Sequence, residues 1–121
     1  MQHCLVVDDS SVIRKVSRRI LEEMKFRVSE AENGERALSL CQTDMPDVVL
    51  LDWNMPVMDG YEFLTRFRQM PGGADTKIVF CTTENDGAYI SRALQAGANE
   101  YIMKPFDKDI LEAKFQEVGL L

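Results

Sequence analysis

The sequence lacks several features that would assign it at once to a functional class. None of its apolar runs is as long as a membrane span, and its first residues lack the basic segment of a secretion signal. Twenty acidic residues against fourteen basic ones leave no positive excess to displace the counterions of nucleic-acid phosphates. The three cysteines, Cys4, Cys41 and Cys81, lack the spacing of a metal site. We therefore expect a cytoplasmic protein with buried, reduced thiols that binds neither nucleic acid nor membranes.

The sequence contains instead short apolar runs that alternate with helical patterns. This alternation is typical of βαβ units, in which the strands are parallel and buried. Strands are predicted at His3–Asp8, Arg27–Ala31, Val48–Leu51, Lys77–Cys81 and Glu100–Met103, and helices at Ser11–Met24, Gly34–Gln42, Tyr61–Gln69, Gly87–Ala96 and Asp107–Val118. Right-handed crossovers would place helices on both faces of the sheet. Because there is no repeat, linker or low-complexity segment, residues 1–121 are expected to form one domain without an output domain.

Apolar spacing predicts which side of two helices faces the core. The apolar stripe of the first helix consists of Val12, Ile13, Val16, Ile20, Leu21 and Met24. In the fourth helix Leu94 is the candidate for the core-facing side. The helical step then places Tyr89 on another side, where it is a candidate anchor for a partner. The alternative for Tyr89 is a ring that lies flat on its own helix.

Charged side chains stand at the ends of three predicted strands. Asp8 and Asp9 end the first strand, Asp52 follows the third and Lys104 follows the fifth. Ligands of open α/β sheets bind at the carboxyl ends of the strands, so these side chains are expected to meet at one edge. Any single aspartate could simply cap the following helix. Together, three carboxylates would repel one another unless a cation neutralised them, and Mg²⁺ prefers such oxygen ligands.

The same edge of the sheet suits phosphoryl chemistry. Lys104 supplies an ammonium that can contact a phosphate, and Thr82 supplies a hydroxyl at the end of the fourth strand. A carboxylate such as Asp52, flanked by a divalent cation, an ammonium and a hydroxyl, can attack phosphorus and form an acyl phosphate. The flanking groups would stabilise the charge on the equatorial oxygens of the transferred group.

In combination, these segments resemble the receiver domain of response regulators in two-component signalling, over nearly the whole chain. The matching positions are Asp8-Asp9, Asp52, Asn54-Met55-Pro56, Met58-Asp59-Gly60, Thr82, Ala96-Gly97-Ala98 and Lys104-Pro105-Phe106. The resemblance implies an α/β fold, a flavodoxin-like, doubly wound (βα)5 sandwich. Its parallel five-stranded sheet would have the strand order 2-1-3-4-5, with helices on both faces.

The resemblance also implies how the charged cluster is used. Asp52 would be phosphorylated by a histidine kinase or a histidine phosphotransfer protein. Mg²⁺, for which Mn²⁺ can substitute, would be held by Asp8, Asp9 and Asp52 and by the backbone carbonyl of Asn54.

Further implied roles concern catalysis and the response to phosphorylation. Thr82 and Lys104 would act with Asp52 in catalysis by contacting the phosphoryl oxygens, and the peptide bond between Lys104 and Pro105 would be cis. Tyr101 occupies the aromatic switch position of the family, with an ordinary strand tyrosine as the alternative. A downstream protein target would bind the face formed by the fourth helix, the fifth strand and the fifth helix.

Two residues depart from the usual family pattern, and another pair refines the expected role. Thr83 is larger than the residue often found there, and Trp53 is expected to place a bulky ring near the mouth of the site. Asn54 and Glu84 resemble the pair that tunes hydrolysis of the acyl phosphate in the motor-binding chemotaxis regulator. This likeness favours a phosphorylatable switch in chemotaxis or motility over a phosphorelay shuttle. The switch would not be an enzyme for other substrates, because it would catalyse only its own phosphoryl transfer and dephosphorylation.

The alternatives to a chemotaxis switch are a phosphorelay shuttle, a metal-dependent phosphatase and a DNA-binding regulator. A phosphorelay shuttle would pass the phosphate from Asp52 to a histidine phosphotransfer protein. A metal-dependent phosphatase with an aspartyl nucleophile is less compatible, because Asn54 stands where such enzymes need a general acid. A DNA-binding regulator would need a helical reader domain or a basic face, and neither is expected here.

Overall fold

The structure, a computed structural model, describes residues 1–83 and 87–121, apart from the side chain of Tyr89. The expectations for Glu84 and for the Tyr89 anchor therefore lie outside the described residues. The strands are β1 (His3–Val7), β2 (Arg27–Ala31), β3 (Val48–Asp52), β4 (Lys77–Thr82) and β5 (Glu100–Met103), and the helices are α1 (Ser11–Glu23), α2 (Gly34–Thr43), α3 (Gly60–Arg68), α4 (Gly87–Gln95) and α5 (Lys108–Glu117). Each end lies within one residue of its predicted position.

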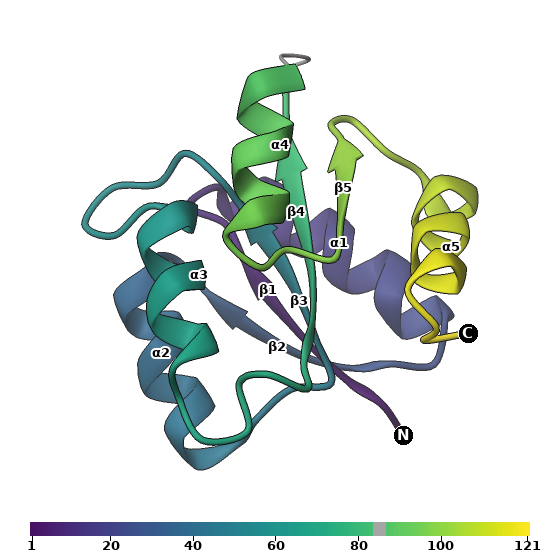
Figure 1. Cartoon of the computed structure of the whole chain (residues 1–121). Helices are drawn as coiled ribbons and strands as arrows, with labels where there is room; N and C mark the ends of the chain where they lie inside the picture. Colours follow the sequence, from purple (N-terminus) through teal and green to yellow (C-terminus); the bar gives the residue numbers. More distant parts are fainter. Residues whose placement is uncertain (84–86) are drawn as a thin grey trace.

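The five strands form one parallel sheet in the order β2-β1-β3-β4-β5, as predicted. Helices α2, α3 and α4 cover one face of this sheet, and α1 and α5 cover the other (Figure 1). Strands β1 and β3 are buried along their whole length because they are central and are covered on both faces. The predicted flavodoxin-like fold is confirmed. In the part of the chain that the structure describes, no helix has both the length and the apolar character to cross a membrane.

Two apolar clusters hold the three layers together. On one face, Phe63 and Phe67 of α3 pack in the same cluster as Phe80 of β4. On the other face, Leu21 of α1 shares a cluster with Phe115 of α5. All five side chains are fully buried, so each contributes roughly 1.5–3 kcal/mol of hydrophobic stabilisation. The three cysteines are also buried and unpaired, as expected.

The predicted apolar stripe of α1 is wrong at two positions. Val12 and Val16 are 66% and 49% exposed, whereas Ser17 and Leu21 are buried. By the helical step of 100°, Val12 and Val16 lie about 140° and 100° around the axis from Ser17. Ser17 was not predicted to face the sheet because it is not apolar, yet it is buried there.

The prediction that Leu94 is the core-facing residue of α4 is also wrong. Leu94 is 40% exposed, and its neighbour Ala93 is fully buried in the cluster under α4. A small residue lets the helix lie close to the sheet, so hydrophobic size is a poor guide to orientation here.

Local sequence fixes the start of α3 beside the end of β3. The side chain of Asp59 caps the helix by accepting a hydrogen bond from the Glu62 backbone N–H at 2.9 Å. The Gly60 N–H donates to the Trp53 carbonyl at 2.9 Å. A Cβ at Gly60 would lie 2.8 Å from the Asp52 carbonyl oxygen, so only glycine permits this close approach. The Met58-Asp59-Gly60 segment therefore sets the position of the β3 end.

Arg68, the last residue of α3, joins α3 to the loops before β4 and β5. Its Nη1 donates to the carbonyls of Gly73 and Thr76, both at 2.7 Å. Its Nε and Nη2 donate to the Gly97 carbonyl at 3.0 and 2.6 Å, and Nη2 also donates to Asn99 Oδ1 at 2.9 Å. Arg68 therefore connects the end of α3 to the loop before β4 and to the segment between α4 and β5. No sequence pattern indicates this role of Arg68.

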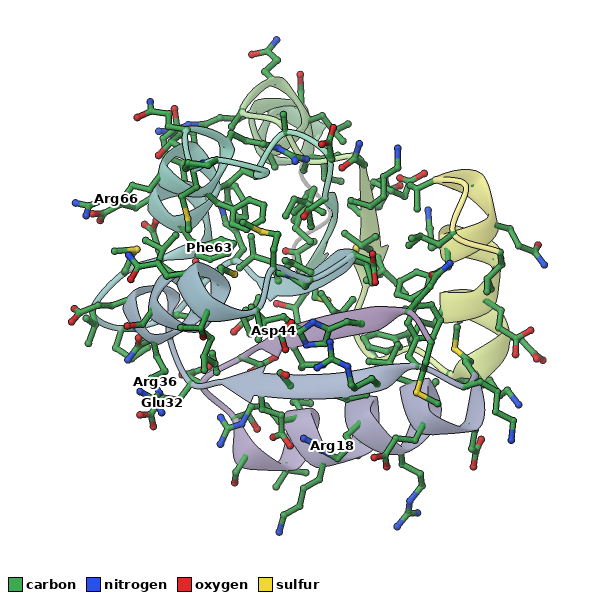
Figure 2. The ribbon with its side chains drawn as sticks, turned by 90° about the horizontal axis from the view of Figure 1, so that it is seen from below. Arg18, Glu32, Arg36, Asp44, Phe63 and Arg66 are labelled. Carbon is green, nitrogen blue, oxygen red and sulfur yellow. The ribbon has the colours of Figure 1, made fainter. Side chains whose placement is uncertain are left out.

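We expect Arg68→Met to lower the free energy of unfolding by about 2–4 kcal/mol, because buried carbonyl acceptors would lose a charged donor. Urea unfolding measures this change. The matched control is Arg66→Met on the same helix, since Arg66 points away from the body of the molecule (Figure 2) and forms an exposed ion pair with Glu62. The control should lose less than about 0.5 kcal/mol. Equal losses in the two variants would contradict the role of Arg68.

Candidate functional site

Three aspartates meet at the carboxyl edge of the sheet. One carboxylate oxygen from each of Asp8, Asp9 and Asp52 lies within 4.8 Å of the other two. Asp52 is the last residue of β3, and Asp8 directly follows β1, which pairs with β3 through Val7 and Leu51. Asp8 and Asp52 are buried and Asp9 is exposed, so the cluster is open to solvent on the side of Asp9.

Hydrogen bonds from several parts of the chain hold Asp8 in place. Its backbone N–H donates to the Ala31 carbonyl at 3.1 Å, which ties it to the end of β2. Its Oδ1 accepts from the Ser10 N–H at 2.9 Å. Its backbone carbonyl accepts from Arg14 Nη1 at 2.6 Å. The side chain of Ser10 in turn caps α1 by accepting from the Ile13 N–H.

Lys104 bridges two of the three carboxylates. Its Nζ donates to Asp8 Oδ2 at 2.8 Å and to Asp52 Oδ1 at 3.0 Å. Burial alone would lower the pKa of Lys104, but the hydrogen bonds to Asp8 and Asp52 outweigh it and raise the pKa. Lys104 is therefore charged across the physiological range. The peptide bond between Lys104 and Pro105 is cis.

One ammonium does not neutralise three carboxylates. Burial, together with the smaller effect of the charges of Asp8 and Asp9, raises the pKa of Asp52 to about 6, against the opposing contribution of Lys104. Asp52 is thus ionised at neutral pH, but its ionised form is destabilised by its surroundings. The cluster carries an unbalanced negative charge beside an open face. Oxygen donors in this arrangement fit Mg²⁺, which binds a small number of carboxylates and retains waters.

Thr82 and Tyr101 lie near this cluster on neighbouring strands. Thr82 ends β4, is 3% exposed and is one residue beyond Cys81, which pairs with Asp52 across the strands. Its backbone carbonyl accepts from the Lys104 N–H at 2.9 Å, so the ends of β4 and β5 are joined. Tyr101 is half-buried and pairs with Phe80, two residues before Thr82 on the same face of the sheet. Thr82 therefore lies on the strand between that of Asp52 and that of Tyr101.

Two further predicted residues, Asn54 and Trp53, follow Asp52 in the loop after β3 and differ in exposure. Asn54 is exposed in the loop after β3. Trp53 was expected near the mouth of the site, but it is only 6% exposed and packs on Phe80 with the ring centres 5.1 Å apart. Its indole lies in the core because it is the first residue after β3 and points to the same side as the α3 cluster.

Arg14 is a neighbour of the cluster that the sequence pattern did not predict. The Arg14 side chain is 18% exposed and reaches the Asp8 carbonyl. The spacing of six residues between Asp8 and Arg14 gave no helical signal, because Asp8 lies outside the helix.

Comparison with known proteins assigns this geometry to a family. The sequence matches the response regulator receiver domain over residues 4–116. The chain belongs to the response regulator receiver domain family. It is 39% identical over 116 residues to a chemotaxis protein CheY homolog of Campylobacter jejuni, and this match covers 94% of the chain and 89% of that protein.

Solved structures of receiver domains show the same fold. The chemotaxis protein CheY4 of Vibrio cholerae is 34% identical, with a TM-score of 0.93 and coverage of 98% of both chains. A CheY-like receiver domain protein of Methanospirillum hungatei is 28% identical, with a TM-score of 0.88 and coverage of 98% of this chain and 93% of that chain.

The raised pKa of Asp52 predicts a measurable effect on stability. Its pKa is about 6 in the fold against 3.8 ordinarily, so ionised Asp52 destabilises the fold above about pH 6, and this penalty disappears as the pH falls toward 4. In the presence of a chelator, Asp52→Asn should therefore raise the free energy of unfolding by up to about 3 kcal/mol near pH 8. Urea unfolding should show a smaller gain near pH 5.

The control for this experiment is Asp75→Asn, which makes the same chemical change at an exposed position far along the chain. It should alter stability by less than about 0.5 kcal/mol. A destabilised Asp52→Asn variant at pH 8 would show that Lys104 overcompensates the carboxylates, contrary to the expected sign.

Proposed function

We propose that the protein is a phosphorylatable switch in which Asp52 accepts a phosphoryl group from a histidine kinase or a histidine phosphotransfer protein. The observation that carries this proposal is the bridging of Asp8 and Asp52 by the Lys104 ammonium, beside an acidic cluster open at Asp9. The membership of the receiver family supports the same reading.

The proposed transfer uses the residues in simple roles. An ionised oxygen of Asp52 attacks the phosphorus of phosphohistidine, the phosphorus–nitrogen bond breaks, and the imidazole nitrogen takes up a proton. Asp8, Asp9, Asp52 and the Asn54 carbonyl are the proposed ligands of Mg²⁺, which when bound supplies positive charge next to the phosphoryl oxygens. Lys104 contributes a second positive charge to these oxygens, and Thr82 contributes a hydroxyl.

Reset of the proposed switch is hydrolysis. Water attacks phosphorus, the bond to the Asp52 oxygen breaks, and inorganic phosphate leaves. Asn54 and Glu84 are proposed to tune this step by orienting the water. The protein thus acts catalytically only on its own phosphoryl group, which distinguishes it from a phosphatase with external substrates.

We propose chemotaxis as the setting, because the matched proteins of Campylobacter jejuni and Vibrio cholerae are named as chemotaxis proteins. A cytoplasmic location suits transfer from a histidine kinase. The downstream protein would bind the face formed by α4, β5 and α5, where Tyr101 lies half-buried. A phosphorelay shuttle has no specific observation in its favour.

The first test is phosphorylation by acetyl phosphate with Mg²⁺, followed by mass spectrometry of the intact protein. One phosphoryl group should be incorporated, and incorporation should be absent in Asp52→Asn and in the presence of a chelator. Asp75→Asn, with its carboxylate removed at an exposed position, should be labelled as the wild type. Stoichiometric labelling of Asp52→Asn at another residue would contradict the assignment of Asp52.

The second test concerns Thr82 as the link to Tyr101. We expect beryllofluoride, a phosphoryl mimic, to shift the ¹⁹F resonance of fluorotyrosine at Tyr101, because Thr82 moves toward the bound group and leaves space for the ring. In Thr82→Ala the mimic should still bind, but the shift should be largely lost. Tyr101→Phe assigns the resonance, and the exposed neighbour change Thr83→Ala is the control. An undiminished shift in Thr82→Ala would show that Tyr101 responds by another route.

A further inference from the structure

Arg14, a side chain of α1, contacts the backbone of the acidic cluster rather than its carboxylates. Arg14 Nη1 donates to the backbone carbonyl of Asp8 at 2.6 Å. This carbonyl belongs to the peptide group that joins Asp8 to Asp9. Because a peptide group is planar, fixing its oxygen also fixes the orientation of the bond that leads to the Asp9 Cα.

The peptide group on the other side of Asp9 is fixed as well. It contains the Ser10 N–H, which donates to Asp8 Oδ1 at 2.9 Å. Asp9 is the exposed member of the cluster, and its direction therefore depends on the two peptide groups that flank it. Arg14 holds one of them, and the Asp8 side chain holds the other.

Arg14 is itself held in position by an acidic partner on β2. Its Nε donates to Glu30 Oε1 at 3.1 Å, while Arg18 Nε donates to Glu30 Oε2 at 2.6 Å. Figure 2 shows Arg18 on α1, next to the sheet edge. Glu30 lies one residue before Ala31, whose carbonyl accepts from the Asp8 N–H. These hydrogen bonds therefore connect the end of β2 to α1, α1 to the loop after β1, and that loop back to the end of β2.

We infer that Arg14, anchored by Glu30, is a positioning residue that orients the Asp8–Asp9 peptide and thereby sets the affinity of the acidic cluster for a divalent cation. The inference rests on the proposed function, since it concerns the same metal site. It adds a residue that does not touch the ion and acts through the backbone of two of its ligands. Outer contacts of this kind commonly change metal affinity by roughly 10–100-fold.

Charge and geometry predict opposite signs for the loss of Arg14. An arginine repels a nearby cation, so if charge were its only effect, Arg14→Met would strengthen binding. If Arg14 positions the peptide, Arg14→Met weakens binding even though a repulsive charge is removed. Arg14→Lys adds a second distinction, because it keeps the charge but cannot donate from one planar group to both Asp8 and Glu30.

The experiment measures binding of Mn²⁺, as a stand-in for Mg²⁺, by the electron paramagnetic resonance of the free ion. For Arg14→Met we expect a dissociation constant raised roughly tenfold, and for Arg14→Lys a smaller rise that still exceeds the error. The matched control is Arg18→Met, which removes the same charge from the same helix and the same partner, Glu30, but leaves the Asp8 carbonyl contact. It should change the dissociation constant by less than about twofold. Thermal unfolding in a chelator shows whether each variant is folded.

The outcomes separate this inference from the proposed function. Unchanged or tighter binding in Arg14→Met would overturn the inference, and so would binding by Arg14→Lys equal to that of the wild type. If Arg14→Met fails to fold, Arg14→Lys alone decides, because it retains the charge and the stem of the side chain. Absence of Mn²⁺ binding by the wild type, or wild-type affinity in Asp9→Ala, would instead overturn the proposed metal site itself.

Discussion

The unbalanced charge at the carboxyl edge of the sheet is the constraint on which the rest of the structure depends. Three carboxylate oxygens lie within 4.8 Å of one another, and Lys104 contacts only two of the three residues. The raised pKa of Asp52 is the direct consequence. A fold that keeps such a cluster must hold it by other means, since the charges themselves favour separation. A divalent cation relieves the same repulsion, which links metal affinity to stability.

The means of holding the cluster are the fully buried central strands and the contacts that fix the loops after them. β1 and β3 deliver Asp8 and Asp52 side by side because their parallel register is set by buried residues on both faces. The close approach of Gly60 to the Asp52 carbonyl and the Arg14 contact with the Asp8 carbonyl then restrict the strand ends. At this edge, the backbone contacts that hold the strand ends in place therefore involve the same residues that form the acidic cluster.

The sequence predicted the element types, their bounds and the grouping of Asp8, Asp9, Asp52 and Lys104, because these depend on the alternation of apolar runs and on the geometry of parallel sheets. It failed where the outcome depends on packing between elements. Val12 and Val16 are exposed because α1 turns Ser17 toward the sheet, and Ala93 rather than Leu94 faces the core under α4. Trp53 enters the core, and Arg14 and Arg68 reach backbone carbonyls outside their own helices. Hydrogen bonds from a long side chain to a carbonyl leave no periodic signal.

The distribution of ring contacts limits how a phosphoryl group at Asp52 can alter the outer helices. Trp53, Phe80 and Tyr101 form an aromatic row with centre distances of 5.1 and 6.1 Å. Lys114 of α5 lies 4.6 Å from the centre of the Tyr101 ring, and Arg92 of α4 lies 4.5 Å from the centre of Tyr61, which contacts Trp53. Close-packed rings shift between discrete arrangements rather than continuously.

Each of the two cation contacts contributes about 0.5–1 kcal/mol, whereas converting a two-state equilibrium from 1:99 to 99:1 requires about 5.5 kcal/mol. Loss of the cation–ring contact of Lys114 or of Arg92 alone therefore supplies too little free energy to convert the protein from one state to the other. In the proposed switch, most of the difference must come from contacts made only with the phosphoryl group. The side chains proposed to make these contacts are Lys104, whose Nζ lies 3.0 Å from Asp52 Oδ1, and Thr82, at the end of the neighbouring strand β4. In this proposal the outer helices would report the change, and the contacts at the sheet edge would supply its free energy.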